Sequence, residues 1–317
     1  MSNDLWIGID LGGTKILAGL FDDSFTCLAR AKEPTPTPAQ GPTAVFAAVD
    51  RVVTKVLVDA KANRAQIRGM GFGIPGQIDP VNRRVKFAPN LEWHNVDLSA
   101  LIPADWTWPV TVENDVRAGT YGEWKHGAAK GARHVLGVFA GTGVGGCLIL
   151  DGKPFYGFNH NAGEIGHIII NWRKGTELEA IAGRRAMMKR AADRLSDSPK
   201  RVRKEWKGID LAKVRSSQLS EFYDKDDPVA VDLIDDAARA LGAGIGSVIN
   251  LISPEVVVLG GGVAGALGES FLERVWEIAT RYALPGAASG VRIVPAALQD
   301  DSGIVGAAAY ARDQAKM

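Results

Sequence analysis

The most constraining feature of this sequence is a pattern that occurs twice: a short apolar run, a glycine-rich turn and a second short apolar run. It lies at residues 5–22, around the turn DLGGTK, and again at residues 134–150, around AGTGVGG. Two apolar runs separated by a glycine turn are typical of an antiparallel β-hairpin. The repetition predicts two similar halves, each presenting a glycine hairpin to the same ligand.

The rest of the chain interleaves strands with helices. Apolar residues recur at helical spacing in 43–60, 177–195, 227–252 and 302–315, and further strands are predicted at 27–31, 67–76, 109–115 and 255–261. Because hairpins occur beside crossovers, the pattern favours a mixed α/β sheet over a doubly wound Rossmann sheet. We expect a smaller domain over residues 1–115, joined by a C-terminal helix at about 301–317, and a larger domain over 116–300.

The composition and charge of the chain limit the kinds of partner that it can bind. A chain of 317 residues, 46% of them hydrophobic, can bury two moderate cores, and a net charge of +1 without a strongly basic block predicts no nucleic-acid partner. The two cysteines, Cys27 and Cys147, are too few for a disulfide framework or a metal cluster. No apolar run reaches the roughly 18 residues of a membrane span, and the opening MSNDLWIGID lacks a basic-then-apolar leader. We expect a cytoplasmic protein with no membrane partner.

The first glycine turn has the chemistry of a phosphate-binding loop. Gly12 and Gly13 lack a Cβ, so the backbone can take positive φ and its N–H groups can approach an anion. Thr14 adds a hydroxyl donor and Lys15 adds positive charge. Asp10 would be repelled by bare phosphate, which predicts a cation between them, most simply Mg²⁺ with its waters. The alternative is an ordinary hairpin turn, and this turn alone does not separate the two.

Two further turns are rich in glycine. The turn at 140–146 again offers glycines and a threonine but no acid, and two such turns favour phosphate binding more than one does. The third, VVVLGGGVAGA at 256–266, could place a nucleotide base and ribose against bare backbone, although tight strand-to-helix packing explains it equally. It lacks the G-x-G-x-x-G spacing, which disfavours a dinucleotide site.

Several polar residues stand where a ligand with hydroxyl groups could bind. Asn114 and Asp115 lie where a predicted strand passes into a helix. One interpretation is a helix N-cap; the other places Asp115 at the crevice where α/β sheets bind ligands, ready to accept a proton from a substrate hydroxyl. Glu164 and His167, in a glycine-flanked segment, and Glu179, at a predicted helix start, supply acceptors and donors suited to a sugar.

These motifs together resemble those of the ROK family of sugar kinases and repressors, within the actin-like, hexokinase-like ATPase superfamily. The resemblance runs along nearly the whole chain, from IGIDLGGTK through GFGIPGQID, ENDVRAGTYGE and NHNAGEIGH to VVVLGGGVA and DDSGIVGAA. It implies two actin-like, ribonuclease H-like domains with mixed sheets flanking a deep cleft. It also implies ATP-dependent phosphorylation of glucose or a close relative at the 6-hydroxyl, as in glycolysis.

The resemblance further implies roles for individual residues, with Asp115 as the catalytic base. The residues that would hold the phosphates of ATP are Asp10, Gly12, Gly13, Thr14, Lys15, Gly141, Thr142, Gly143 and Gly145, of which Asp10 would also hold Mg²⁺ through water. The residues that would border the adenosine are Gly260, Gly261 and Gly262. The residues that would hold the sugar are Gly76, Asn90, Asn114, Asp115, Glu164, His167 and Glu179.

One segment departs from the family pattern. Family members usually follow the histidine of the GH motif with a cysteine-rich zinc segment, whereas His167 is followed by IIINWRKGTELEA, which is shorter and has no cysteine. Structural zinc needs about four nitrogen or sulfur ligands. We therefore expect no zinc, and a His167 ring fixed by packing and a backbone carbonyl.

Alternatives to a glucokinase stay open. The accepted sugar could be N-acetylmannosamine, fructose, mannose or allose, and the donor could be polyphosphate, because glycine loops bind any polyphosphate chain. A sugar-sensing repressor is disfavoured, because the first strand begins by Leu5, leaving no room for a helix-turn-helix module, and Asp115 is present. We expect a small-molecule sugar and ATP as ligands, and a homodimer as the assembly.

Overall fold

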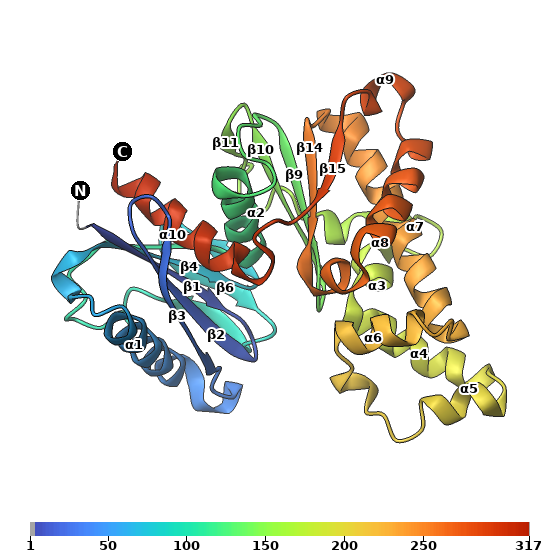
Figure 1. Ribbon diagram of the computed structural model, residues 1–317, viewed down its shortest axis with the longest axis horizontal. Helices are drawn as coiled ribbons and strands as arrows, with labels where there is room; N and C mark the ends of the chain where they lie inside the picture. The colour runs from blue at the N-terminus through green and yellow to red at the C-terminus, as the bar shows by residue number, and fades with distance from the viewer. Residues whose placement is uncertain (1–3, 317) are drawn as a thin grey trace. The chain divides into compact units, whose positions relative to one another are not determined.

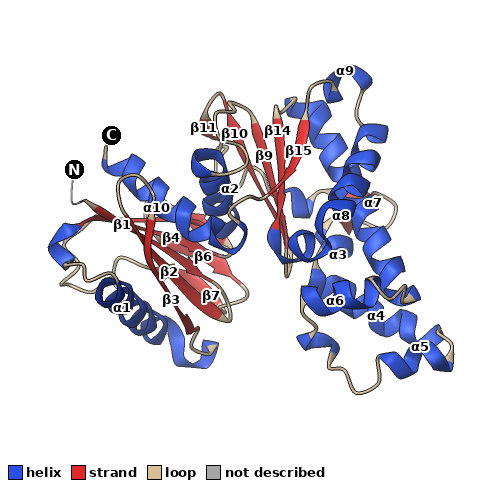
Figure 2. Cartoon of the chain, in the orientation of Figure 1, coloured by secondary structure: helices blue, strands red, loops and turns tan. Residues whose placement is uncertain are grey.

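The structure is a computed structural model that describes residues 4–316, without the side chains of residues 201 and 203. The chain divides into two compact units (Figure 1). Unit 1 comprises the chain up to Gly131, Tyr156–Asn161 and the chain from Asp300 onward, and unit 2 comprises Ala132–Phe155 and Ala162–Gln299. Each unit is built on one five-stranded mixed sheet with helices around it (Figure 2). The expected fold class, two α/β domains with mixed sheets, is confirmed.

The sheet of unit 1 has the strand order β3-β2-β1-β4-β8. Its strands are β1 (Leu5–Leu11), β2 (Lys15–Phe21), β3 (Cys27–Pro34), β4 (Ile67–Ile74) and β8 (Val110–Asn114). β2 runs antiparallel to both β1 and β3, whereas β4 is parallel to β1 and β8 is parallel to β4. The predicted hairpin at residues 5–22 is confirmed.

Helices cover both faces of this sheet. α1 (Gly41–Asp59) packs its buried valines on β2 and β3, while α10 (Ser302–Ala315) lies on β1 and β4 and also packs against α2 (Asp115–His126). α10 approaches the strands so closely that two positions need glycine. A Cβ at Gly8 would lie 1.8 Å from the carbonyl oxygen of Ile304, and one at Gly71 would lie 1.9 Å from that of Ala307.

A second, three-stranded sheet in unit 1 has the order β5-β6-β7. It consists of β5 (Gln77–Asp79), β6 (Arg84–Ala88) and β7 (Trp93–Asp97), and the short helices η1 (Pro38–Gln40) and η2 (Arg64–Gln66) complete the unit. This sheet is not predicted from the sequence, because strands of three to five residues leave almost no periodic signal.

The sheet of unit 2 repeats the topology of the first, with the order β11-β10-β9-β14-β15. Its strands are β9 (Val135–Ala140), β10 (Val144–Leu150), β11 (Lys153–Pro154), β14 (Val256–Gly260) and β15 (Arg292–Pro295). β10 is antiparallel to β9 and β11, β14 is parallel to β9, and β15 is parallel to β14. The prediction of two similar halves is confirmed in the order and direction of the strands.

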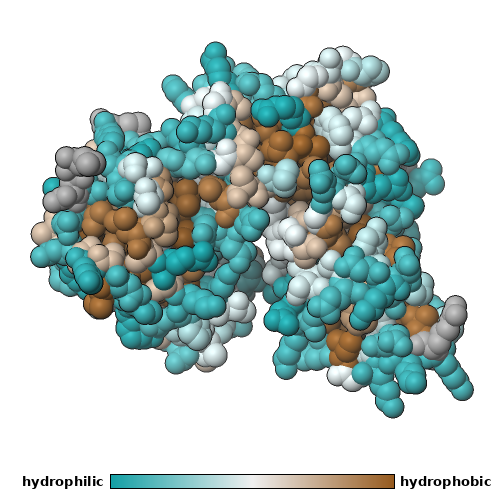
Figure 3. Space-filling view, viewed as in Figure 1, coloured by the Kyte–Doolittle hydropathy of each residue, from teal (hydrophilic) through white to brown (hydrophobic). Residues whose placement is uncertain are grey.

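The helices of unit 2 surround this sheet, and α7 packs along α8. They are α3 (Glu179–Ala182), α4 (Arg184–Asp197), α5 (Lys200–Glu205), α6 (Ser216–Tyr223), α7 (Pro228–Ile252), α8 (Gly261–Tyr282) and α9 (Pro285–Ala288). The shorter elements are η3 (Ile165–His167), β12 (Ile169–Asn171), β13 (Thr176–Glu177), η4 (Leu211–Lys213) and η5 (Gln299–Asp301), the last of which leads into α10. Hydrophilic residues cover most of the visible surface around α4, α5 and α6 (Figure 3).

Two details differ from the sequence patterns. The helical pattern at 177–195 forms two helices, α3 and α4, because Gly183 between them has an extended backbone. The expected domain boundary near residue 115 falls at the start of α2, whereas unit 1 continues through α2 and takes back Tyr156–Asn161. Among the helices of residues 4–316, none is long and apolar enough to cross a membrane.

Candidate functional site

In unit 1 the parallel strands β1, β4 and β8 end at the same edge of the sheet. Asp10 lies opposite Gly73 in the β1–β4 register, and Asn114 lies opposite Ile74 in the β4–β8 register. Asp115 follows directly, and a Cβ at Gly73 would lie 3.4 Å from its Cα. This edge is where α/β sheets bind ligands, and it brings the carboxylates of Asp10 and Asp115 into one neighbourhood.

The electrostatics of this edge favour a cation. Burial, together with the negative charge of Asp115, raises the pKa of Asp10 to about 7, although the positive charge of Lys15 opposes the rise. A carboxylate that is hard to ionise alone is stabilised by a nearby positive charge. Magnesium prefers oxygen ligands and is commonly held by one or two carboxylates. Asp10 therefore fits a Mg²⁺ site.

Asn114 and Asp115 divide the two roles that the sequence left open. Asn114 is the N-cap of α2, since its Oδ1 accepts hydrogen bonds from the N–H groups of Val116 at 2.9 Å and Arg117 at 3.1 Å. Its Nδ2 donates to the carbonyl oxygen of Gly76 at 3.0 Å. Asp115 is the first residue of the helix, and its Oδ1 also accepts from the N–H of Val116, at 2.9 Å, so the N-cap is the amide of Asn114 while the carboxylate of Asp115 is oriented by the same helix N-terminus.

Two consecutive N–H groups of the β1–β2 turn have no partner in the described part of the chain. The N–H of Gly12 donates to the carbonyl oxygen of Lys15 at 2.9 Å, which closes the turn. Thr35 holds the turn from outside, donating its hydroxyl to the carbonyl oxygen of Gly12 at 2.6 Å and its N–H to that of Thr14 at 3.1 Å. Among the described residues, the N–H groups of Gly13 and Thr14 have no hydrogen-bond partner. Such a pair can bind an anion.

The expectation of positive φ at Gly12 and Gly13 is wrong, because neither is among the glycines with positive φ. Close contact explains the glycine at position 13 instead. A Cβ at Gly13 would lie 3.1 Å from the Cβ of Asn90, so the turn packs against a residue predicted to bind sugar. Lys15 is half-exposed and lies 3.8 Å from the carboxylate of Asp300.

The β9–β10 turn of unit 2 repeats the free N–H pair with different support. The N–H of Gly141 donates to the carbonyl oxygen of Gly143 at 2.8 Å, and the N–H groups of Thr142 and Gly143 have no partner within residues 4–316. The carboxylate of Glu179 accepts from the N–H of Val144 at 2.7 Å. Gly145 lies inside β10, opposite Phe139, and not in the turn itself.

Helices close around the second turn. The first N–H groups of α4, from Arg184 and Arg185, donate to the carbonyl oxygens of Gly141 and Thr142 at 3.0 and 3.1 Å. Gly261, at the start of α8, has φ +87°, and a Cβ there would lie 2.4 Å from the carbonyl oxygen of Ala140. The N-terminus of α8 thus lies against the turn, where its unpaired N–H groups and dipole favour an anion.

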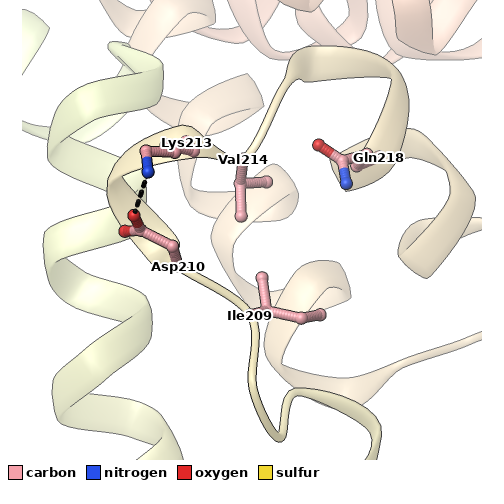
Figure 4. A pocket seen from close by; sticks show the side chains of 5 residues that line it. All are labelled: Ile209, Asp210, Lys213, Val214 and Gln218. Carbon is pink, nitrogen blue, oxygen red and sulfur yellow. Dashed lines mark ion pairs between the residues drawn. The ribbon is translucent and has the colours of Figure 1, made fainter.

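A pocket adjoins these elements, lined by Ile209, Asp210, Lys213, Val214 and Gln218 (Figure 4). In Figure 4 the ion pair of Lys213 with Asp210, at 3.2 Å, spans one side of it.

Arg184 joins the pocket to the second turn. Its guanidinium donates to the carbonyl oxygen of Val214 and, at 3.2 Å, to the hydroxyl of Thr142. Nearby, a Cβ at Gly262 would lie 3.3 Å from the hydroxyl of Ser216. Neither Arg184 nor Ser216 is predicted from the sequence. Arg184 could have been found from its position in the motif LEAIAGRRA, five residues after Glu179.

The other predicted sugar-binding residues of unit 2 lie beside β10. Glu164 directly precedes η3, and His167 ends it. A Cβ at Gly166 would lie 2.0 Å from the carbonyl oxygen of Val144, so η3 packs tightly on the strand that follows the second turn. The backbone-carbonyl partner expected for His167 is wrong for Nδ1: that atom lies 3.1 Å from Oε2 of Glu177, and the hydrogen bond raises the pKa of His167.

The residues around His167 do not fit a cysteine-rich zinc site. Cys27 is an exposed residue of β3 in unit 1, and Cys147 is buried in β10. No group of three or more His, Cys, Asp or Glu side chains in the described part of the chain is arranged to hold a metal ion. The ring of His167 has a carboxylate partner instead.

Two units with the same mixed sheet and a glycine turn between the first two strands of each define the actin-like ATPase fold class. The chain matches the ROK family model over residues 6–314, and it belongs to the ROK family.

Three relatives show what this chain is similar to. It is 32% identical to the glucokinase of Streptomyces coelicolor over 98% of each chain. A ROK family glucokinase from Streptomyces griseus, solved with glucose and AMPPNP, has a TM-score of 0.82 and 31% identity over 98% of this chain and 99% of that one. The inorganic polyphosphate/ATP-glucomannokinase of Arthrobacter sp. strain KM has a TM-score of 0.66 and 30% identity over 98% and 99%. These similarities support a sugar kinase.

Proposed function

We propose that this protein is an ATP-dependent glucokinase that phosphorylates the 6-hydroxyl of glucose. The observation that carries the proposal is the edge of the unit 1 sheet, where Asp115 lies beside Asp10, the residue that leads into a turn with two N–H groups unbonded among the described residues. Phosphoryl transfer needs a base, an aligned nucleophile and charge neutralisation. The similarity to glucokinases at 31–32% identity supports glucose as the acceptor.

In the proposed reaction Asp115 accepts the proton of the sugar hydroxyl as its oxygen attacks the γ-phosphorus of ATP. The new P–O bond forms to the sugar, and the bond between the γ-phosphorus and the β,γ-bridging oxygen breaks, so that ADP leaves with the electron pair. A base contributes on the order of 10² to 10⁴ in rate. Asp115 is suited to this because Asn114 supplies the N-cap of α2, and the N–H of Val116, which donates to Oδ1 of Asp115 at 2.9 Å, orients the carboxylate.

The free N–H groups of both turns are proposed to bind the phosphates, those of Gly13 and Thr14 in unit 1 and those of Thr142 and Gly143 in unit 2. Mg²⁺, held by Asp10 through water, would neutralise phosphate charge when bound. Adenosine is proposed to lie against Gly260, Gly261 and Gly262, beside the pocket in Figure 4.

The sugar is proposed to be bound by side chains with a hydrogen-bonding group left over. Glu179 uses Oε2 to accept from Val144, which leaves Oε1 for a hydroxyl. The His167 ring uses Nδ1 toward Glu177, which leaves Nε2. Glu164 of unit 2, and Gly76, Asn90 and Asn114 of unit 1, complete the predicted set.

A panel of sugars tests this proposal. ADP release is measured with Mg²⁺ and ATP and, in turn, glucose, mannose, fructose, allose and N-acetylmannosamine. We expect the highest kcat/KM for glucose. A tenfold preference for another sugar would replace glucose as the substrate, and no phosphorylation of any sugar would contradict kinase activity.

The phosphoryl donor is tested by repeating the assay with polyphosphate. Backbone N–H groups bind phosphate oxygens of any polyphosphate chain, and the glucomannokinase above is named for both donors. We expect ATP to be used, because the glycines at the start of α8 and the adjoining pocket offer a place for adenosine. Rates with polyphosphate that exceed those with ATP would reverse this assignment.

A further inference from the structure

The His167–Glu177 pair is held by backbone structure on both sides. Gly166 packs on β10, and the N–H of His167 donates to the carbonyl oxygen of Glu164 at 3.1 Å, which fixes the histidine. Glu177 lies opposite Ile169 in the β12–β13 pairing, and the next residue, the buried Leu178, donates its N–H to Ile168 at 3.0 Å. Backbone contacts therefore fix the positions of both His167 and Glu177.

We infer that Glu177 is a positioning residue, which keeps a proton on Nδ1 of His167 and thereby presents Nε2 to the sugar. An ionised carboxylate only accepts hydrogen bonds, so the imidazole nitrogen that faces it must carry the hydrogen. In the neutral ring Nε2 is then an acceptor for a sugar hydroxyl. The part of this inference that concerns sugar rests on the proposed function.

The charges around the ring act in the same direction. The hydrogen bond to Glu177 raises the pKa of His167 most, desolvation opposes the rise, and the charges of Glu177, Glu179 and Glu164 add to it. His167 and Glu177 are 59% and 44% exposed, so water screens the pair. A screened pair contributes little to stability, and its effect should therefore be on ring orientation and tautomer.

The first test observes the ring directly in ligand-free protein. Nitrogen-15 NMR of the histidine side chains reports which ring nitrogen carries the proton and at which pH the ring titrates. In the native chain we expect the Nδ1–H tautomer for neutral His167. In Glu177→Gln the pKa of His167 should fall and the Nε2–H tautomer should become populated. Glu269→Gln, the same change at an exposed glutamate in α8, should leave both unchanged.

The second test is kinetic. Loss of an exposed charge-assisted contact is expected to raise KM for glucose about fivefold in Glu177→Gln, with kcat within about twofold. Glu177→Asp, which keeps the charge on a shorter side chain, should recover part of the affinity. Glu269→Gln should match the native enzyme, and melting curves show whether each variant is folded.

The outcomes separate this inference from the proposed function. An unchanged tautomer and pKa in a folded Glu177→Gln would overturn the role of Glu177, whatever the kinetics show. A shifted tautomer with unchanged KM would overturn the contact of His167 with sugar. A native protein that phosphorylates no sugar would overturn the proposed function, while the NMR result would still decide the bond between Glu177 and Nδ1.

Discussion

The two units share one sheet topology but support their glycine turns differently. In unit 1 the turn follows Asp10, and the side chain and backbone of Thr35 hold its carbonyl groups. In unit 2 no acid precedes the turn; the carboxylate of Glu179 and the start of α4 hold it instead. Both turns nevertheless have two successive N–H groups that make no hydrogen bond to any described residue.

The difference between the two units suggests that both bind phosphate, whereas unit 1 carries the groups for the catalytic step. The pair of N–H groups is common to both units and fits phosphate binding by both. The two neighbouring aspartates, Asp10 and Asp115, belong to unit 1, and no aspartate precedes the turn of unit 2. Glu179 connects the second turn to a predicted sugar ligand. We therefore expect changes in unit 1 to affect mainly kcat, and changes in unit 2 to affect mainly KM.

The largest effect is expected from Asp115→Asn. Removing the base should lower kcat by a factor on the order of 10² to 10⁴, while calorimetry should show glucose binding retained. Asn114→Ala is the structural counterpart, because it removes the N-cap of α2 and should lower the free energy of unfolding by about 1 kcal/mol. A decrease in kcat of less than tenfold in Asp115→Asn would show that Asp115 is not the base.

A smaller effect should distinguish the turns. A Cβ at Gly143 would lie 2.2 Å from Oε2 of Glu179, whereas one at Gly13 would lie 3.1 Å from Cβ of Asn90. Gly143→Ala should displace Glu179 and raise KM for both ATP and glucose, by about tenfold if one charged hydrogen bond is lost. Gly13→Ala should have the weaker effect on both constants. Steady-state kinetics with each substrate varied decides between them, and the opposite order would contradict the comparison.

Acid should weaken unit 1 through His126 of α2. Burial, with the charges of Arg312 and Lys130, lowers the pKa of His126 to about 4 from 6.5. Between these values the unfolded chain binds a proton that the folded chain does not, so stability is present above pH 6.5 and is lost as the pH falls toward 4.

The test compares urea unfolding at pH 7 and pH 5. Because His126 is partly exposed, we expect a loss of about 1 kcal/mol in the native chain. His126→Gln should lose less between the two pH values, and His94→Gln, which changes an exposed histidine of β7, should lose as much as the native chain. Equal losses in all three proteins would rule out His126 as the sensor.

The last prediction is that removing zinc has no effect, because we expect the protein to bind no zinc. His167 faces Glu177, and neither Cys27 nor Cys147 lies in its segment. Dialysis against a chelator, followed by return of Mg²⁺, should leave activity and Tm unchanged, and elemental analysis should find no stoichiometric zinc. About one zinc per chain, with activity lost on its removal, would contradict this expectation.

The sequence predicted best where local pattern and tertiary packing agree. The apolar runs at 5–10 and 16–22 predict the hairpin of β1 and β2, and the helical periodicity over 227–252 predicts α7. The Asp227 N-cap of α7 is also a local feature, since its carboxylate accepts from the N–H groups of Val229 and Ala230. Such elements need no knowledge of distant residues.

The sequence failed where a residue's role depends on a distant neighbour. Gly13 is explained by contact with Asn90, and Glu177 faces His167 only because the β12–β13 pairing puts it there. The carboxylate of Glu179 is predicted to bind sugar, but the hydrogen bond that it accepts from the N–H of Val144 depends on the folded β9–β10 turn and could not be predicted from the sequence. The sequence motifs identified Gly13, Asn90, His167 and Glu179 without showing what each one contacts, and Glu177 was not identified from the sequence.

The central claim, transfer of a phosphoryl group from ATP to glucose with Asp115 as base, is tested most directly by phosphorus-31 NMR. The native protein with glucose and Mg²⁺·ATP should produce a phosphomonoester signal as fast as the γ-phosphate signal disappears, and Asp115→Asn at the same concentration should produce almost none. Loss of the γ-phosphate to inorganic phosphate alone, or equal phosphomonoester formation by the variant, would contradict the account.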